Sequence, residues 1–446
     1  MSNKLKNRHL QMIALGGAIG TGLFFGLAKS IPFTGPSILL SYLLGGIIMY
    51  IIMRALGEMV VYEPNSGAFS YYATKYVNQY LGFLSGYYAW FEYTIVCMLE
   101  VTAVTMFLDL WFPTLPHYII VAVILAVFLL INLMHVNLFG EFEFWFSGIK
   151  VTTIILMIIF ALYLIFIDHN ISKNVMVNIN DHIKHNFFAG GMQGFLFSLV
   201  MVVFSFGGTQ FVGIAAADAV DPNRTVPKAI NGIILRIVIF YIGTIAVILC
   251  LYPWRLLSTD VSPFVDVFQK IGLGTAATIM NIIAITAALS AFNSCLYAAS
   301  RILKSLANSG LAPNKLGVVN KHGVPKNAVI FTSIVIAITI IINYLFPHKA
   351  IIYLIAIATT SIIVTWSTIL ICHIAFRLKV NNQTYKLPLF PILNIIALII
   401  LIAVIIIMTK MPDMQLAVYL MPVWIICLTI AYIIKQKFYT KKITKI

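Results

Sequence analysis

Long uninterrupted apolar runs constrain this chain more than any other feature. Residues 119–131 and 395–408 are entirely apolar, so their apolar side chains lie on every face of any helix they form. Only 10% of the 446 residues are charged, whereas a soluble domain has roughly 25%. A bilayer core requires about 20 mostly apolar residues per helix. The sequence therefore predicts an all-α polytopic membrane protein, and it excludes an ordinary soluble enzyme and a disordered chain.

Apolar windows bounded by polar or Pro/Gly clusters predict twelve transmembrane helices. An even number of spans places both termini on the same side of the membrane. With this topology, 21 of the 29 Lys and Arg residues lie on the side of the termini, 7 lie on the other side, and Lys150 belongs to neither. Because basic residues favour cytoplasmic loops, we expect both termini in the cytoplasm. The expected spans are residues 10–31, 37–58, 82–111, 117–134, 144–167, 192–216, 231–253, 274–303, 326–346, 350–373, 387–408 and 414–434.

The remaining composition adds no second function. The net charge of +15 does not indicate nucleic acid binding, because the basic residues lie between apolar spans. The five cysteines are scattered singly and favour neither a disulfide framework nor a zinc site. His182 and His185 share a polar loop, but two histidines make a weak metal signal, so no metal or cofactor is expected. The apolar run after residue 9 continues into a full span, without a signal-peptide cleavage pattern.

Glycines interrupt two of the expected spans. The first contains Gly16-Gly17-Ala18-Ile19-Gly20-Thr21-Gly22, and the sixth contains Phe204-Ser205-Phe206-Gly207-Gly208-Thr209-Gln210. Small residues of this kind allow close helix packing. Two interrupted spans, each opening a block of five, fit better with an inverted repeat of discontinuous helices. Helix N-termini at such breaks favour a carboxylate and freed carbonyls favour an ammonium, so the pair suits a zwitterionic ligand.

Motifs along nearly the whole chain resemble bacterial amino acid permeases of the amino acid–polyamine–organocation superfamily. The resemblance implies a five-plus-five inverted repeat: residues 1–167 as the first repeat, 168–373 as the second, and 374–446 as two further helices and a cytoplasmic tail. It also implies a proton-coupled amino acid importer of the bacterial cytoplasmic membrane, whose partners are the amino acid, protons and lipid. The motifs are Asn7–Gln11, Gly16–Phe24, Arg54–Met59, Phe139–Glu141, Phe144–Lys150, Phe204–Thr209, Asp221-Pro222, Val226–Ile230, Tyr252–Trp254, Ala291–Ser294 and Gly323–Pro325.

The resemblance also implies where a substrate binds. Backbone amides around Gly20, Thr21 and Gly22 would receive its carboxylate. Carbonyls near Ala18, Ile19 and Phe204 would receive its ammonium, and Phe204 or Phe206 would cover it, unless these rings serve helix packing. Gln210 is also expected to bind the substrate, and relatives usually carry Glu there and at Asp218. Gln210 cannot titrate, so a proton-carrying role at position 210 is excluded, and the role of Asp218 stays open.

Glu92, Glu100 and Lys150 are ionisable residues inside the expected spans, where charge is costly and usually functional. Glu92 and Glu100 share one side of the third span. The resemblance places Glu100 near the substrate, with a substrate or proton role, whereas the role of Glu92 stays open. Lys150 lies near the start of the fifth span. Its side chain either snorkels to the membrane interface or, as the resemblance implies, occupies the place that a coupling cation takes in sodium-coupled relatives. A desolvated ammonium releases its proton more readily, so Lys150 is the expected proton carrier.

Other function classes remain to be separated. No pattern of a known enzyme class accompanies the spans, and a channel would need a filter-like ring. A nutrient sensor on the permease fold would differ only by lacking flux. The C-terminal half resembles aromatic and neutral amino acid permeases, whereas the fifth and sixth spans also resemble lysine permeases. We therefore expect neutral or aromatic substrates, with a basic amino acid as the alternative.

Overall fold

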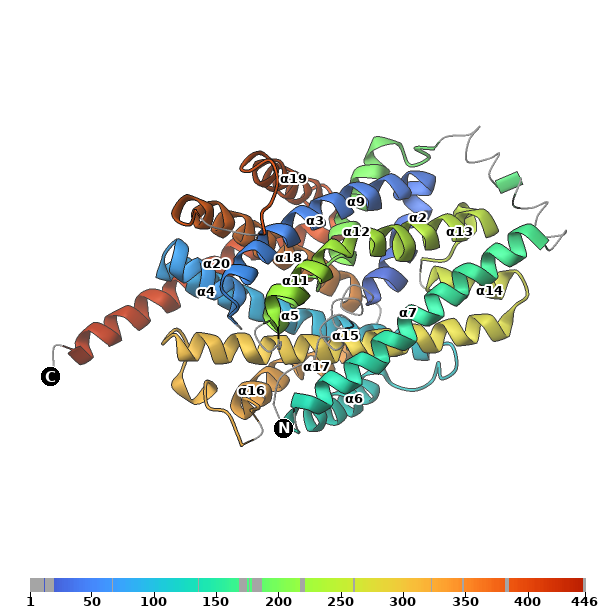
Figure 1. Cartoon of the computed structure of the whole chain (residues 1–446). Coiled ribbons are helices and arrows are strands. Elements are labelled where there is room, and N and C mark those ends of the chain that lie inside the picture. Colours follow the sequence, from blue (N-terminus) through green and yellow to red (C-terminus); the bar gives the residue numbers. More distant parts are fainter. Residues whose placement is uncertain are drawn as a thin grey trace.

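The computed structural model of the chain describes most of its residues. The described residues are 12, 20–65, 67–134, 136–167, 175, 177–178, 187–216, 221–259, 261–321, 323–346, 349–381 and 385–443. Within these ranges all regular structure is helical (Figure 1). Ala18, Ile19 and Asp218, which the sequence analysis singled out, lie outside them.

The described part of the chain is a succession of helices. The first half contains η1 (Gly22–Gly26), α2 (Leu27–Thr34), η2 (Gly35–Ser37), α3 (Ile38–Tyr62), α4 (Ala68–Tyr76), α5 (Gln79–Leu108), α6 (His117–Leu133) and α7 (Val136–Ile167). The second half contains α9 (Gly191–Ser205), α10 (Phe211–Ala215), α11 (Pro222–Asn231), α12 (Ile233–Arg236), η4 (Ile237–Gly243), α13 (Thr244–Leu251), η5 (Trp254–Leu256), α14 (Pro263–Lys270), α15 (Gly274–Asn308), η6 (Asn314–Leu316), α16 (Lys326–Ile336), α17 (Ile338–Leu345), α18 (Ala350–Lys379), α19 (Ile392–Met408) and α20 (Pro412–Ile443).

Many of these helices are long and apolar enough to cross a membrane. Among the described residues, eight helical stretches meet this criterion, and α6, α9 and α19 are shorter apolar helices. The helical structure and these apolar stretches confirm the prediction of an all-helical polytopic membrane protein. Several helices extend beyond their predicted windows; among them, α7 begins at Val136 instead of 144, and α11 begins at Pro222 instead of 231. Both extensions contain polar residues, which end the apolar windows without ending the helices. At α11, the Asp221 side chain accepts a hydrogen bond from the Arg224 amide as an N-cap.

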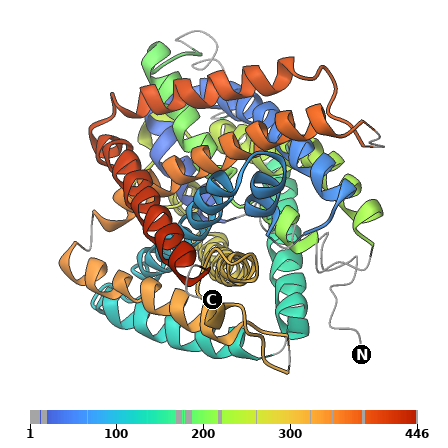
Figure 2. The same cartoon turned by 90° about the vertical axis from the view of Figure 1, so that its left-hand side faces the viewer.

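The centre of the molecule is formed by α5, which packs against both α15 and α18. Of the most apolar stretch in α5 and in α18, 78% is buried, compared with 17% in α20. Figure 2 shows α15 nearly end-on, with the other helices around it. Polar side chains on α5, α15 and α18 are therefore held away from the surroundings of the protein.

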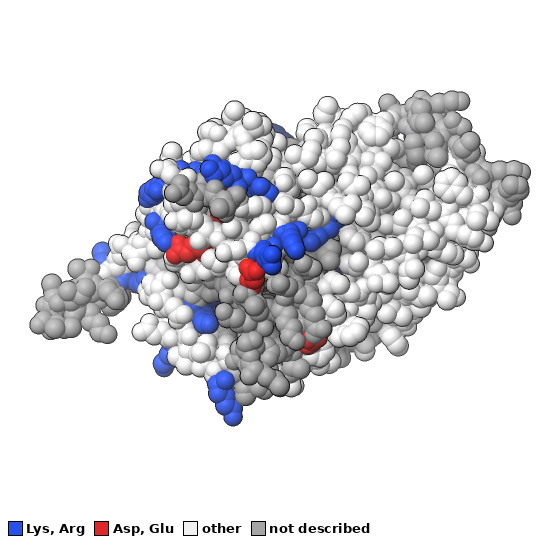
Figure 3. Space-filling view, viewed as in Figure 1, with Lys and Arg blue, Asp and Glu red and all other residues white. Residues whose placement is uncertain are grey.

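The surface separates charged from apolar regions. On the face in Figure 3, the coloured Lys, Arg, Asp and Glu side chains gather toward the end where α4 and the C-terminal part of α20 lie. The opposite end of that face shows no described charged side chain. Large apolar side chains such as Phe166, Leu130 and Ile399 are at least 60% exposed. Such a surface suits lipid contact, because water would make this exposure costly.

Candidate functional site

The helical chain is interrupted between α9 and α10. Residues 206–210 form turns, and Gly208 has a φ of +90°, a conformation that glycine adopts at little cost. The last residue of α9 is tied to the start of η1, because the Ser205 hydroxyl donates a 2.9 Å hydrogen bond to the Gly22 carbonyl oxygen. Tyr42 and Tyr241 bond Ser205 as well, at 2.8 and 3.0 Å. The break is thus fixed directly beside the glycine-rich start of η1.

A small cavity of about 40 Å³ lies at this junction. Because about 10–15 Å³ of such space holds one water, the cavity has room for a few waters. A whole amino acid would require its walls to move apart. The walls come from η1 and the residues before it, α5, the break, α10, α15 and α18. They are Gly20, Gly22, Tyr93, Val96, Glu100, Phe204, Ser205, Gly207, Gly208, Phe211, Ala291, Ser294, Cys295 and Ile362.

Three polar atoms in the cavity wall have no hydrogen-bond partner within the described part of the chain. They are the Tyr93 hydroxyl, Glu100 Oε2 and the Ser294 hydroxyl, on side chains that are at most 5% exposed. The other Glu100 oxygen accepts a 2.9 Å hydrogen bond from Thr21 Oγ1. An unsatisfied buried polar group costs about 1–3 kcal/mol. Three of them around one cavity are the arrangement that a polar ligand would satisfy.

The structure brings some of the expected site residues together and separates others. Gly20, Gly22, Glu100 and Phe204 line the cavity, and Thr21 bonds Glu100. The Phe206 ring instead packs behind the break, with its centroid 5.7 Å from that of Tyr42 and 4.8 Å from that of Tyr241.

The sequence analysis did not identify Tyr93 and Ser294 as site residues. A signal for Tyr93 exists in the sequence. Tyr93, Val96 and Glu100 follow the i, i+3, i+7 spacing of one helix face, and all three line the cavity.

Gln210 belongs to a separate buried network. Its amide nitrogen donates to Glu92 Oε1 at 2.5 Å, and its amide oxygen accepts from Trp366 Nε1 at 3.1 Å. Thr365 Oγ1 donates to the second Glu92 oxygen at 2.5 Å. Both ends of the Gln210 amide and both oxygens of Glu92 are therefore bonded within the protein. This network joins α5 and α18 to the break beside the cavity.

Lys150 is completely buried on α7. Its Nζ donates a 3.0 Å hydrogen bond to Ser290 Oγ on α15, and Ser290 Oγ donates a 2.8 Å bond to Glu143 Oε1. The side chain thus extends inward, toward α15, rather than outward to an interface as in the snorkelling interpretation. Glu143, which is 1% exposed, was not predicted from the sequence.

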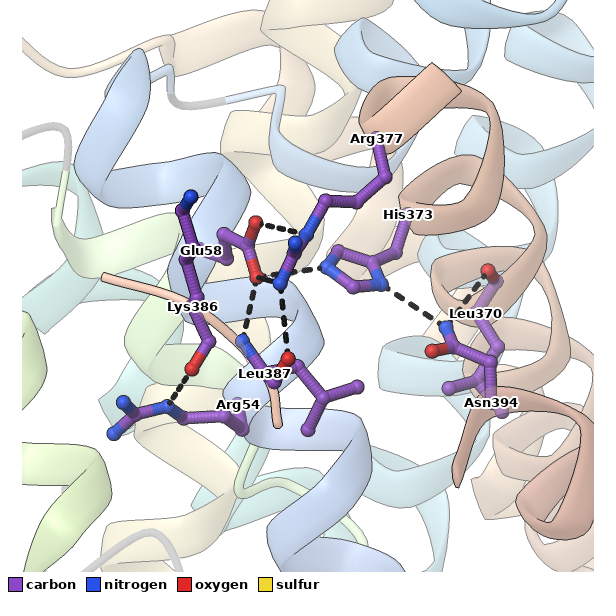
Figure 4. Close-up of polar contacts among 8 residues, drawn as sticks. All are labelled: Arg54, Glu58, Leu370, His373, Arg377, Lys386, Leu387 and Asn394. Carbon is purple, nitrogen blue, oxygen red and sulfur yellow. Dashed lines mark hydrogen bonds and ion pairs between the residues drawn. The ribbon is translucent and has the colours of Figure 1, made fainter. Parts of the chain in front are cut away.

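A second buried charge cluster lies where α3 and α18 end (Figure 4). Glu58 Oε2 accepts hydrogen bonds from His373 Nε2 at 3.0 Å, Arg377 Nη2 at 3.1 Å and the Leu387 amide at 2.7 Å. Glu58 Oε1 lies 2.5 Å from Arg377 Nε. Asn394 Nδ2 lies 3.0 Å from His373 Nδ1 and donates a 3.4 Å hydrogen bond to the Leu370 carbonyl. Through the bond between Glu58 and the Leu387 amide, the cluster holds the segment before α19 against α3.

Comparisons with known proteins cover nearly the whole chain. The model of the family described as "Amino acid permease" matches residues 9–445. The aromatic amino acid transport protein AroP of Escherichia coli K12 is 44% identical over 437 residues, which are 97% of this chain and 95% of that protein. AroP of Salmonella typhimurium LT2 is 42% identical over the same shares of both chains. The uncharacterized transporter YdgF of Bacillus subtilis 168 is 38% identical over 436 residues, again 97% of this chain and 95% of the relative.

Proposed function

This chain belongs to the amino acid permease family, and on that premise we propose that it is a proton-coupled importer of neutral or aromatic amino acids. The family resemblance inferred from the sequence is confirmed, and family members are membrane transporters. The observation that carries the proposal is the cavity beside the helix break, with the unpartnered atoms of Tyr93, Glu100 and Ser294 in its wall.

The proposal includes the topology expected from the sequence. The chain crosses the bacterial inner membrane twelve times with both termini in the cytoplasm, as two inverted repeats (1–167 and 168–373) followed by residues 374–446. Three observations support it. Helices occupy most of the described part of each expected window, and glycine-rich stretches coincide with the break at 206–210 and with the start of η1. The charges in Figure 3 gather at one end of the molecule, as a membrane protein with a basic cytoplasmic side would have them.

The substrate would bind across the junction of η1 and the break. Its carboxylate would meet backbone amides around Gly20, Thr21 and Gly22. Its ammonium would meet Glu100 Oε2, together with carbonyls near Phe204. The opening of η1 supports the carboxylate end, because the first amides of a helix have no partner within the helix. Bound substrate would thereby satisfy groups that are buried without partners.

The cavity wall favours a neutral side chain over a cationic one. Val96, Phe211 and Ile362 supply apolar surface, and Glu100 is the one acidic residue in the wall as described. A lysine-type substrate would require a second acid for its side chain. Glu92 is not available for this, because Gln210 and Thr365 already bond both of its oxygens. The aromatic substrates in the printed names of the AroP relatives point in the same direction.

Lys150 would carry the coupling proton. Its burial and its bond to Ser290 support this role, because an ammonium held away from water gains stability when it gives up its charge. Protonated and neutral Lys150 would hold the surrounding helices differently, which would link proton release to reorientation of the transporter.

Transport by the purified full-length protein in proteoliposomes tests the proposal. We expect labelled phenylalanine, tyrosine or tryptophan to accumulate when an inward proton gradient is imposed. Unlabelled neutral and aromatic amino acids should compete, and lysine and arginine should not. Dominant competition by lysine would establish the basic amino acid alternative. Substrate binding without flux would indicate a sensor and overturn the transporter proposal.

A further inference from the structure

The buried face of α7 is a single stripe that begins with polar residues. The buried positions from residue 143 onward alternate in steps of four and three, which places them on one side of the helix. The first members of this stripe are Glu143, Ser147 and Lys150, and apolar residues follow. Seven residues span about 10 Å along a helix, so Glu143 and Lys150 lie two turns apart. The stripe comprises Glu143, Ser147, Lys150, Ile154, Met157, Ala161 and Leu164.

Ser290 of α15 connects the acid and the base of this stripe. A hydroxyl donates one hydrogen bond while accepting another. Ser290 Oγ accepts from Lys150 Nζ at 3.0 Å and donates to Glu143 Oε1 at 2.8 Å. Glu143, Lys150 and Ser290 are each at most 1% exposed. The chain Lys150–Ser290–Glu143 is therefore a continuous hydrogen-bonded path between a proton donor and a proton acceptor.

We propose that Glu143 receives the proton that Lys150 releases, through the Ser290 hydroxyl. This inference rests on the proposed coupling role of Lys150. One N–H bond of the Lys150 ammonium breaks as the proton bonds to Ser290 Oγ, and the original Ser290 hydroxyl proton bonds to Glu143 Oε1. The products are a neutral amine, an unchanged serine and a neutral carboxylic acid, so no proton enters or leaves the protein in this step.

The surroundings make such a transfer favourable. A buried ion pair loses its hydration, and its mutual attraction often fails to repay that loss. Moving the proton removes both charges at once. The other titratable groups whose charges reach Lys150 are Glu100 from α5 and Cys295 from α15. Neither takes part in the hydrogen bonds that lead to Glu143.

The position of Glu143 gives the step a direction. Glu143 lies two turns closer to the start of α7 than Lys150 does. In the proposed topology α7 begins on the cytoplasmic side. Glu143 would therefore hold the proton on its way from the site of coupling to the cytoplasm.

Paired variants of the full-length protein in proteoliposomes test the relay. Glu143→Gln removes the acceptor, and Ser290→Ala removes the bridge. Ser147→Ala is the matched control, because Ser147 also donates to Glu143 Oε1, at 3.3 Å, but does not connect it to Lys150. Three quantities are measured: substrate-driven proton entry with a trapped pH-sensitive dye, gradient-driven accumulation, and exchange of labelled for unlabelled substrate.

We expect Glu143→Gln and Ser290→Ala to lose proton entry and to lower accumulation at least about tenfold, which is below the roughly 10²- to 10⁴-fold contribution of a positioned proton-transfer group. Exchange of labelled for unlabelled substrate should remain within about twofold of the parent protein. Exchange requires only that the loaded transporter reorients, and it does not require release of the proton. Ser147→Ala should retain all three activities.

Several outcomes would contradict the relay. Parent-like coupling in Glu143→Gln, with coupling lost in Lys150→Met, would refute the relay and leave the role of Lys150 intact. Retained coupling in Lys150→Met would instead refute the proposed function of Lys150. If Glu143→Gln loses exchange together with accumulation while remaining folded by gel filtration, Glu143 is structural. If it does not fold, the comparison of Ser290→Ala with Ser147→Ala decides.

Discussion

The hydroxyl of Ser205 donates a 2.9 Å hydrogen bond to the carbonyl oxygen of Gly22, and a Cβ atom on Gly22 would lie only 2.6 Å from the Ser205 Cα. The two residues are 183 positions apart, yet their backbones are in contact. The contact joins the beginning of η1 to the last residue of α9, immediately before the break. Any side chain on Gly22 must therefore push the two glycine-rich stretches apart.

Replacement of Gly22 by alanine or valine should disable transport. The added Cβ meets backbone atoms, which cannot rotate away as a side chain can. We expect uptake to fall at least about tenfold for Gly22→Ala and further for Gly22→Val, with insertion into the membrane retained, because overpacking costs about 1–3 kcal/mol. Gly148→Ala is the matched control, since outside the local helix no atom of the described residues lies within 4 Å of its added Cβ. Normal uptake by Gly22→Val would exclude the break from the site.

The sequence specifies the helices of this protein more completely than its site. Apolar windows locate most helices within a few residues, because burial in lipid requires a long apolar run whatever the neighbours are. The sequence cannot reveal that Phe206 and Gln210 lie outside the cavity wall, because that depends on packing against Tyr241 and Trp366 from other helices. Glu143 was missed for a different reason: α7 begins before the apolar window, which hid the spacing between Glu143 and Lys150.

Glu100→Gln should weaken substrate binding. Thr21 can still donate to the amide oxygen, but the amide NH₂ would then face the cavity in place of Glu100 Oε2. The amide NH₂ and the substrate ammonium would then face each other in the cavity. Both are donors, so no hydrogen bond would form between them. A hydrogen bond to a charged group contributes about 1.5–3 kcal/mol, so we expect Kd to rise about 10- to 100-fold. A binding assay at several pH values measures this.

The control for this prediction is Glu63→Gln, which makes the same change outside the cavity. Glu63 bonds Lys75 and Tyr71 in a partly exposed cluster, and its replacement should leave Kd unchanged. If Glu100→Gln binds substrate with the affinity and pH dependence of the parent protein, Glu100 is structural and the proposed ammonium site is wrong.

Glu58 should contribute more to stability than Glu63 does. The Glu58 carboxylate is fully buried between Arg377, His373 and the Leu387 amide, so its removal leaves charge and donors without a partner. Breaking such a buried pair costs about 3–5 kcal/mol, whereas an exposed pair contributes about 0–1 kcal/mol. We expect Glu58→Ala to lower the unfolding midpoint in detergent strongly, and Glu63→Ala to change it little.

A local measurement separates this effect from general destabilisation. Because the Leu387 amide donates to Glu58, its hydrogen exchange should be faster in Glu58→Ala than in Glu63→Ala. Equal exchange rates at Leu387 in both variants would show that the cluster does not hold the connection before α19.

Lys150 gives the most direct test of coupling. Its ammonium is completely buried and bonded to Ser290, so a change of its charge alters the packing between α7 and α15. Lys150→Met keeps much of the side-chain volume and removes the titration, and should therefore abolish gradient-driven accumulation while substrate binding weakens only moderately. Lys150→Arg should not restore accumulation, because a guanidinium stays protonated under these conditions and would hold one conformation. Lys410→Met, at an exposed lysine, is the control and should accumulate substrate normally. Uptake into proteoliposomes with an imposed pH gradient, beside binding at several pH values, measures both effects. Full accumulation by Lys150→Met would show that the coupling proton is carried elsewhere, and Glu100, whose charge reaches Lys150, would be the next group to test.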